Sequence, residues 1–176
     1  MENEVSREYA KALFELSTSL EEKENDLQNL GVLSVVLLDE EVMKVFKHPT
    51  ITIDAKKELV ATVIQDKVSK TFLSFIEVLI DNKRLGELAN IYESYQNLLD
   101  NELGQMRVKI KTRYALSIDT KQEITHYLAN YYHKKIILSE IIDESLSNGV
   151  LITTGNEQLD LTLATKLNQI INKIKG

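Results

Sequence analysis

Cysteine is absent from this chain of 176 residues, and several other signatures are absent with it. Without cysteine the chain forms no disulfide and has no thiol chemistry, which fits a reducing compartment. No apolar run approaches the roughly 18 residues that a membrane-spanning helix needs. The longest candidate, Val32 to Leu38, is interrupted by Ser34. The amino terminus is acidic, unlike a secretory signal or a transit peptide. We therefore expect a soluble, cytoplasmic protein.

Catalytic and ligand-binding signatures are also scarce. The chain has three histidines, and His126 and His133, which are expected on one helix, lack a third ligand for zinc. Its six glycines form no phosphate-binding loop, because Gly149 and Gly155 are isolated and no Gly-Lys-Ser/Thr follows them. No nucleophile with a neighbouring base can be identified. We expect no catalytic residue, no cofactor and no metal, so the chain is predicted not to be an enzyme.

The chain changes character at Gly104. The single proline, Pro49, and only two glycines precede it, among long runs of helix-forming residues. After it, Met106 to Tyr114 alternates apolar (or Thr) with basic residues, and a repeat of two predicts a strand with one buried face. Residues 1–104 carry 11 Lys+Arg and 20 Asp+Glu (net −9), whereas residues 105–176 carry 10 and 7 (net +3). We predict a mainly α protein with an amino-terminal six-helix bundle, 1–104, followed by a small α/β domain with a short sheet, 105–176.

Hydrophobic periodicity and capping residues place the expected elements along the chain. In the first domain we expect helices at about 4–20, 22–38, 40–47, 68–82 and 87–103, and between the third and the fifth of the six a helix capped by Thr52 or Asp54 that runs to about Gln65. The third ends before His48-Pro49, since a residue that precedes proline is disfavoured in a helix. The sixth ends at Gly104, a left-handed cap. The second domain is expected to have the order β-α-β-β-α, with strands at 106–114, 135–142 and 150–153, a helix that begins at Ser117 or Asp119, and a closing helix at 159–174.

The first and fifth helices carry more apolar surface than one core requires. On the first helix, Phe14 lies outside the stripe that we expect to face the core, which is formed by Val5, Tyr9, Ala12, Leu13, Leu16 and Leu20. On the fifth helix, the apolar arc from Phe72 to Ile80 is about twice the usual width. Two interpretations remain open. The fifth helix is the centre of the bundle, or the two helices form a groove that accepts an amphipathic helix of a partner.

The basic strand also has more than one interpretation. Its cations, Arg107, Lys109, Lys111 and Arg113, would be spaced about 6.8 Å apart on one face and could follow the phosphates of a nucleic acid. Against this, the whole chain has a net charge of −6 and no aromatic-rich nucleic-acid signature accompanies the strand. Alternatively the cations form a solvated sheet face or an edge protected against aggregation, or they dock an acidic protein helix.

Several short motifs, taken together, resemble one family along essentially the whole chain. They are Tyr9-Ala10-Lys11-Ala12-Leu13, the break at His48-Pro49, the run from Phe72 to Asn82-Lys83-Arg84-Leu85, the junction at Gly104, and Asp143 to Leu146 with Gly149. In this order and spacing they resemble the delta subunit of F-type ATP synthase, the oligomycin-sensitivity-conferring protein of mitochondria. The carboxy-terminal signature departs from the family pattern at Asn148 and Ala164.

The resemblance implies a non-catalytic stator subunit at the cytoplasmic face of the bacterial cell membrane, associated with that membrane only through the ATP synthase complex. The amino-terminal bundle would bind amino-terminal helices of the alpha subunits, with a groove expected at Tyr9, Ala12, Leu13, Phe14, Phe72, Ile76 and Leu79. The carboxy-terminal domain would bind the b subunits of the peripheral stalk, at residues expected to include Arg107, Lys109, Lys111, Arg113, Asp143, Leu146 and Gly149. No direct contact with nucleotide is implied. The alternative function is a nucleic-acid-binding adaptor that uses the basic strand 107–113.

Overall fold

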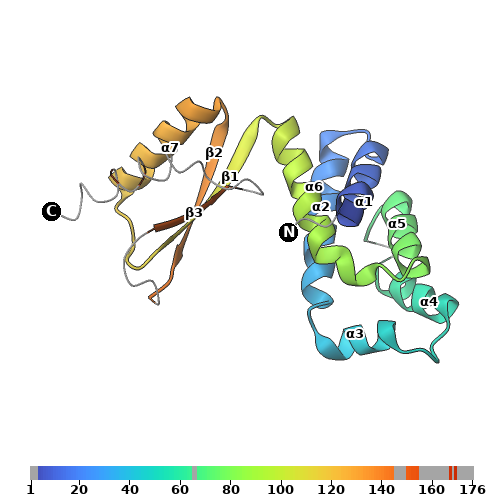
Figure 1. Ribbon diagram of the computed structural model, residues 1–176. Coiled ribbons are helices and arrows are strands. Elements are labelled where there is room, and N and C mark those ends of the chain that lie inside the picture. The colour runs from blue at the N-terminus through green and yellow to red at the C-terminus, as the bar shows by residue number, and fades with distance from the viewer. Residues whose placement is uncertain (1–3, 65–66, 145–149, 155–166, 168, 170–176) are drawn as a thin grey trace. The chain divides into compact units, whose positions relative to one another are not determined.

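The computed structural model describes residues 4–64, 67–144, 150–154, 167 and 169 (Figure 1). The chain divides into two compact units, Met1–Leu99 (unit 1) and Asp100–Gly176 (unit 2). Each unit has its own buried apolar cluster. The fold class predicted from the sequence, a helical bundle followed by a small α/β domain, is confirmed. The functional assignment of the predicted domains 1–104 and 105–176 stays a prediction.

Unit 1 is a bundle of helices joined by short connections (Figure 1). The chain order is α1 (Glu4–Leu16), α2 (Leu20–Val36), α3 (Glu40–Lys47), α4 (Ile53–Ile64), α5 (Lys70–Asp81), the 3-10 turn η1 (Leu85–Glu87) and α6 (Leu88–Glu102). The six predicted helices are all present, with ends that differ by a few residues.

Local signals in the sequence account for most of these helix ends. Ser19 caps α2 in a capping box with Glu22, and Ser69 caps α5 by accepting a hydrogen bond from the Phe72 N–H at 3.0 Å. The α3 helix ends at His48, which is extended, as expected for the residue before Pro49. These ends depend on neighbours in the sequence and were therefore predictable.

The α5 helix is the centre of the unit 1 core. Its buried face packs against buried residues of α1, α2, α4 and α6, and consists of Phe72, Phe75, Ile76, Leu79 and Ile80. This explains the wide apolar arc, because neighbours surround α5 on more than one side. The core face predicted for α1 is confirmed only at Leu13, with Tyr9 partly buried against the core. The buried face is Ser6, Ala10 and Leu13, whereas Ala12 is exposed and Leu16 is 59% exposed. The Ser6 hydroxyl donates to Glu87 at 3.2 Å, so this polar side chain is satisfied inside the bundle.

Unit 2 contains a three-stranded sheet covered on one face by a helix (Figure 1). After α6 the order is β1 (Gln105–Thr112), α7 (Ile118–Tyr132), β2 (Lys135–Ile142) and β3 (Val150–Thr154). The strand order is β2-β1-β3, with β1 parallel to β2 and antiparallel to β3. Because β1 is the middle strand, the interpretation of the basic strand as a protected sheet edge is wrong. The predicted closing helix lies mostly outside the described residues.

The alternation predicted for β1 is confirmed by its burial. Val108 and Ile110 are fully buried against Ile124 and Leu128 of α7, whereas Lys109 between them is exposed. Leu167, near the end of the chain, is buried in the same cluster. Gly104, which ends α6 just before the strand, has a φ of 61°, as expected for a left-handed cap. The sheet therefore has one face in the core and one face that α7 does not cover.

Candidate partner-binding surfaces

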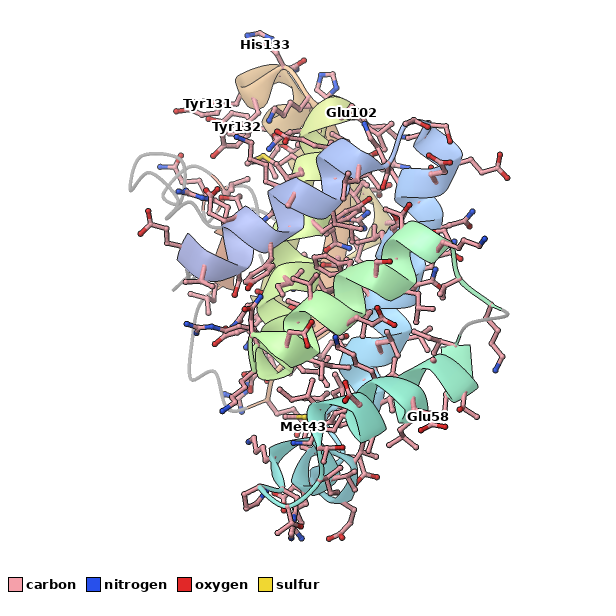
Figure 2. The ribbon with its side chains drawn as sticks, turned by 90° about the vertical axis from the view of Figure 1, so that its right-hand side faces the viewer. Met43, Glu58, Glu102, Tyr131, Tyr132 and His133 are labelled. Carbon is pink, nitrogen blue, oxygen red and sulfur yellow. The ribbon has the colours of Figure 1, made fainter. Side chains whose placement is uncertain are left out.

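A stripe of apolar side chains runs along α1 on the side that adjoins α5. The two helices lie side by side (Figure 2), and the Tyr9 ring meets the Phe75 ring edge-on with 6.4 Å between ring centroids. Val5 precedes Tyr9, and Ala12 and Leu16 follow it, all at helical spacing on this side of α1. On α5, Val78 lies one turn beyond Phe75 and is 45% exposed. We call the set Val5, Tyr9, Ala12, Leu16 and Val78 the α1/α5 surface.

This surface is partly hollowed. A shallow, open depression of about 470 Å³ is lined by Glu4, Val5, Glu8, Tyr9 and Ala12, which all belong to α1. Its lining combines the side chains of Val5, Tyr9 and Ala12 with two carboxylates. Such a shape can receive apolar side chains of a helix that lies along α1.

The seven residues predicted for the alpha-helix groove are divided by the structure between surface and interior. Leu13, Phe72, Ile76 and Leu79 are core residues with at most 1% exposure. Ala12 is exposed and Tyr9 is half-buried. Four of the predicted residues therefore lie beneath the α1/α5 surface rather than on it.

Phe14 lies on another side of α1. Its ring meets the Tyr95 ring of α6 edge-on at 5.3 Å, and the Lys23 ammonium of α2 sits 4.2 Å from its centroid. These contacts fix α1 against α2 and α6.

The sequence did not identify Val5, Leu16 and Val78 as surface residues, although their helical spacing was visible. Periodicity identifies a stripe but does not say whether it faces inward. Contact of any of these residues with a partner stays a prediction.

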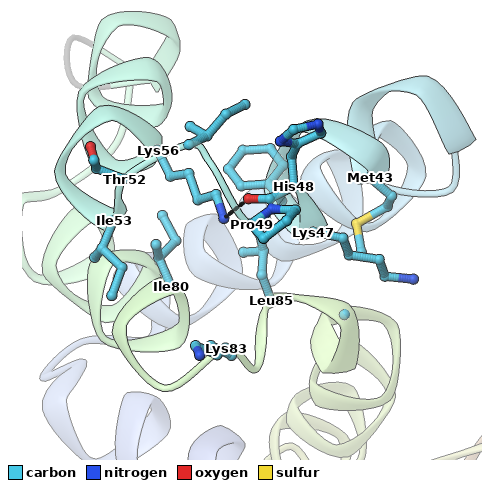
Figure 3. Close-up of a pocket in the computed structure, with 13 residues that line it drawn as sticks. Met43, Lys47, His48, Pro49, Thr52, Ile53, Lys56, Ile80, Lys83 and Leu85 are labelled. Atoms are coloured by element: carbon cyan, nitrogen blue, oxygen red, sulfur yellow. Dashed lines mark hydrogen bonds between the residues drawn. The ribbon is translucent and has the colours of Figure 1, made fainter.

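A second hollow of unit 1, of about 590 Å³, lies between α3, the loop that follows it, α4 and η1 (Figure 3). Apolar side chains such as Phe46, Ile80 and Leu85 line it together with three lysines, Lys47, Lys56 and Lys83. The Lys56 ammonium donates to the His48 carbonyl at 3.1 Å, which ties α4 to the end of α3. Lys83 has a φ of 56°, a conformation that normally favours glycine.

In unit 2, the cations of β1 have different environments. The Arg107 guanidinium Nε lies 2.8 Å from the Asp100 carboxylate, which is 5% exposed and also accepts from the Gln105 amide at 2.9 Å. Lys109 is exposed and Lys111 is half-buried. Arg113 lies beyond the strand, with its guanidinium carbon 5.6 Å from the Tyr114 ring centroid. Arg107 is thus part of a structural ion pair, whereas Lys109 and Lys111 have no ion pair among the residues that the structure describes.

The other predicted stalk residues lie at or beyond the end of β2. The Asp143 N–H donates to the Thr112 carbonyl at 2.8 Å, which continues the pairing of β2 with β1. Leu146 and Gly149 lie outside the described residues. The structure therefore does not place the predicted set on one surface.

Two carboxyl groups have shifted pKa values that are explained by structural contacts. Burial raises the pKa of Asp26, which accepts a hydrogen bond from the Ser17 hydroxyl at 2.6 Å. Burial opposes ionisation of Glu140 too, but hydrogen bonds from Lys121 and the Leu116 N–H outweigh it and lower the pKa of that carboxyl. Both groups join one element to another. In the part of the chain that the structure describes, no group of His, Asp and Glu side chains could hold a metal ion.

Comparisons with known proteins point to one family over nearly the whole chain. The family profile described as ATP synthase delta (OSCP) subunit matches residues 5–174. The ATP synthase subunit delta of Clostridium botulinum (strain Loch Maree / Type A3) is 33% identical over 167 residues, which cover 94% of this chain and 93% of the relative. The ATP synthase subunit delta of Clostridioides difficile (strain 630) is 29% identical over 178 residues, with 99% and 97% covered.

A solved structure has the same fold. One chain of the Toxoplasma gondii mitochondrial ATP synthase hexamer, determined by cryo-EM, matches with a TM-score of 0.66 at 19% identity, covering 99% of both chains. Among the described residues, no helix is both long enough and apolar enough to cross a membrane. The resemblance inferred from short motifs is confirmed by the profile and by the identity to its relatives. The chain belongs to the ATP synthase delta (OSCP) subunit family.

Proposed function

We propose that this chain is a non-catalytic stator subunit of an F-type ATP synthase. It links the catalytic head of alpha and beta subunits to the b subunits of the peripheral stalk, and it associates with the cytoplasmic face of the cell membrane only through that complex. Membership of the delta (OSCP) family over residues 5–174 is the observation that carries this proposal. The division into two units with different surfaces supports it, since a link needs two binding faces.

The physical task of such a subunit is to resist torque. Proton flow turns a rotor, and the head turns with it unless it is held by the stalk. A link under load needs slow dissociation, and buried apolar contacts provide it better than exposed ion pairs, which are screened by salt. No nucleotide and no chemical step is required of the subunit.

The head-binding site in this proposal is the α1/α5 surface. An amphipathic helix of an alpha subunit would lay its apolar side chains along Tyr9, Ala12 and their neighbours. The buried residues Leu13, Phe72, Ile76 and Leu79 support this surface from beneath, and Phe14 holds α1 in place through Tyr95. Their contribution is to position the surface rather than to contact the partner.

The stalk-binding site in this proposal belongs to unit 2, whose sequence carries a net positive charge. The b subunits would bind near Lys109 and Lys111 and near Asp143, which follows β2, and the predicted contacts at Leu146 and Gly149 lie outside the described residues. The alternative function, nucleic-acid binding by residues 107–113, is not supported by any of the comparisons. Within the same strand, Arg107 is already paired with Asp100.

The proposal is tested with inverted membrane vesicles from which this subunit has been removed. Adding back the wild-type chain should restore ATP-driven proton pumping. Tyr9→Asp should lower the affinity for the head at least about tenfold, because it places a charge in an apolar contact, and pumping should fall while ATP hydrolysis by the head continues. Glu15→Gln, on the exposed polar side of α1, is the matched control. If the wild-type chain fails to restore pumping, the proposal is refuted.

A further inference from the structure

The face of the sheet opposite α7 combines lysines with aliphatic side chains. Paired residues on neighbouring strands place their side chains on the same face of a sheet. Lys111 pairs with Ile141 of β2 and Leu151 of β3, and Lys109 pairs with Thr153 of β3. On β1 the residues that alternate with the lysines, Val108 and Ile110, are buried under α7. We call the residues Lys109, Lys111, Ser139, Ile141, Leu151 and Thr153 the outer sheet face.

The aliphatic residues of this face are well exposed. Ile141 is 41% exposed and Leu151 is 52% exposed, on the two strands that flank β1. Single exposed apolar residues are common, but here they stand in one row on either side of Lys111. A partner that covers this row would remove apolar surface from water on both sides of a cation.

The lysines of the face are available for a partner. Among the residues that the structure describes, neither Lys109 nor Lys111 makes an ion pair. Other cations of unit 2 differ, since Arg107 is paired with Asp100 and Lys121 with Glu140, at 2.8 and 2.7 Å. The two ammonium groups are therefore not used to hold the fold together.

An acidic amphipathic helix fits this combination. Carboxylates at positions i and i+4 of a helix are separated by about 6 Å along its axis, close to the spacing of about 6.8 Å between alternate residues of a strand. Apolar side chains on both sides of such carboxylates would cover Ile141 and Leu151. A nucleic acid would leave these aliphatic side chains without a partner, and a second copy of this face would oppose lysine to lysine.

We propose that the outer sheet face is the docking site for an acidic amphipathic helix of the peripheral stalk. The proposal rests on the proposed stator function and identifies the surface and the chemistry of its partner. Lys109 and Lys111 give charge complementarity and speed of association, and the aliphatic residues give the slow dissociation that a load-bearing contact needs. Arg107 lies on the same side of β1 but is held by Asp100, and Arg113 lies beyond the strand, so neither is counted among the docking cations.

The test measures binding of the full-length chain to the purified soluble segment of the b subunits by calorimetry. Lys109→Glu/Lys111→Glu should weaken binding at least about tenfold, and Leu151→Asp should weaken it by a similar factor. Lys67→Glu/Lys70→Glu changes the net charge equally, leaves unit 2 untouched and should bind as the wild type does. For the wild type, raising the salt concentration should weaken binding only in part, since apolar contacts are not screened.

The outcomes separate this proposal from the stator function. If the wild type binds the b segment and both outer-face variants bind equally well, the docking site proposed here is wrong and the stator function stands. If the wild type does not bind the b segment, or binds generic RNA in its place, both are overturned. Circular dichroism and hydrogen exchange of the β1 amides establish that unit 2 of a variant is folded. Should a glutamate variant misfold, Lys109→Gln/Lys111→Gln is used, and unchanged affinity of that pair refutes the proposal.

Discussion

The two candidate docking surfaces of this protein differ in shape and in charge. The α1/α5 surface is an apolar stripe with glutamates beside it, in a sequence region with an excess of acidic residues. The outer sheet face is built on strands and combines lysines with aliphatic side chains. The first can hold a partner mainly by removing apolar area from water, and the second also selects its partner by charge. Because the two faces differ in charge, each can select its own partner, and neither partner would bind well to the face meant for the other.

The largest expected effect distinguishes the interior of unit 1 from its surface. Ile76→Asp should unfold unit 1, because it places a carboxylate among core side chains and costs at least about 3–5 kcal/mol. Val78→Asp, two residues away and 45% exposed, should keep the fold and lose affinity for the head. Far-UV circular dichroism and head binding measure both. A folded Ile76→Asp variant would contradict the position of α5 at the centre of the core.

The next effect compares two cations of β1. Arg107→Ala should destabilise unit 2 by about 1–3 kcal/mol, because Asp100 is left buried without its charged partner. Lys109→Ala should change stability by less than about 0.5 kcal/mol, since its side chain is exposed. Hydrogen exchange of the β1 amides measures both values. Equal losses of stability in the two variants would show that the ion pair between Arg107 and Asp100 does not stabilise unit 2.

A smaller effect should give the two units opposite responses to pH. The pKa of Asp26 is raised above its ordinary value of 3.8, so the folded state holds a proton that the unfolded state has lost, and stability falls as pH rises through this window. The pKa of Glu140 is lowered below 4.5, so its contribution is present above that value and is lost as pH falls through the folded pKa.

Replacing each of these two carboxyl groups by an amide tests the predicted pH responses. At pH 7, Asp26→Asn should stabilise unit 1 and Glu140→Gln should destabilise unit 2, by less than the loss expected for Arg107→Ala. Both differences should shrink below pH 4, where the wild-type carboxyls are protonated in the unfolded state. Hydrogen exchange at several pH values resolves the units separately. A shift of the same sign in both would contradict the assigned causes.

The smallest effect concerns the turn after α5. Lys83→Gly should stabilise unit 1 by about 0.5 kcal/mol, because glycine adopts a positive φ without the strain that a side chain adds, and part of this gain is offset by greater freedom of the unfolded chain. The midpoint of urea denaturation measures it. A clear loss of stability would show that the Lys83 side chain makes contacts that outweigh the strain.

Elements with local causes were predictable from the sequence, and the family was recognisable. Pro49 ends α3, Gly104 ends α6, and alternation along β1 identifies its buried face, since each signal depends on residues close in the chain. The order of short motifs also carried the resemblance to the delta subunit family, which the comparisons confirm.

Tertiary structure decided which faces are covered. Periodicity showed an apolar stripe on α1, but only packing against distant helices placed Ser6 and Ala10 inside and left Leu16 exposed. In the same way, the sequence predicted a strand at β1 but not its place between β2 and β3, which puts aliphatic residues on either side of Lys111. The periodicity of a segment describes its own faces, whereas burial depends on neighbours that the chain brings together from far along the sequence.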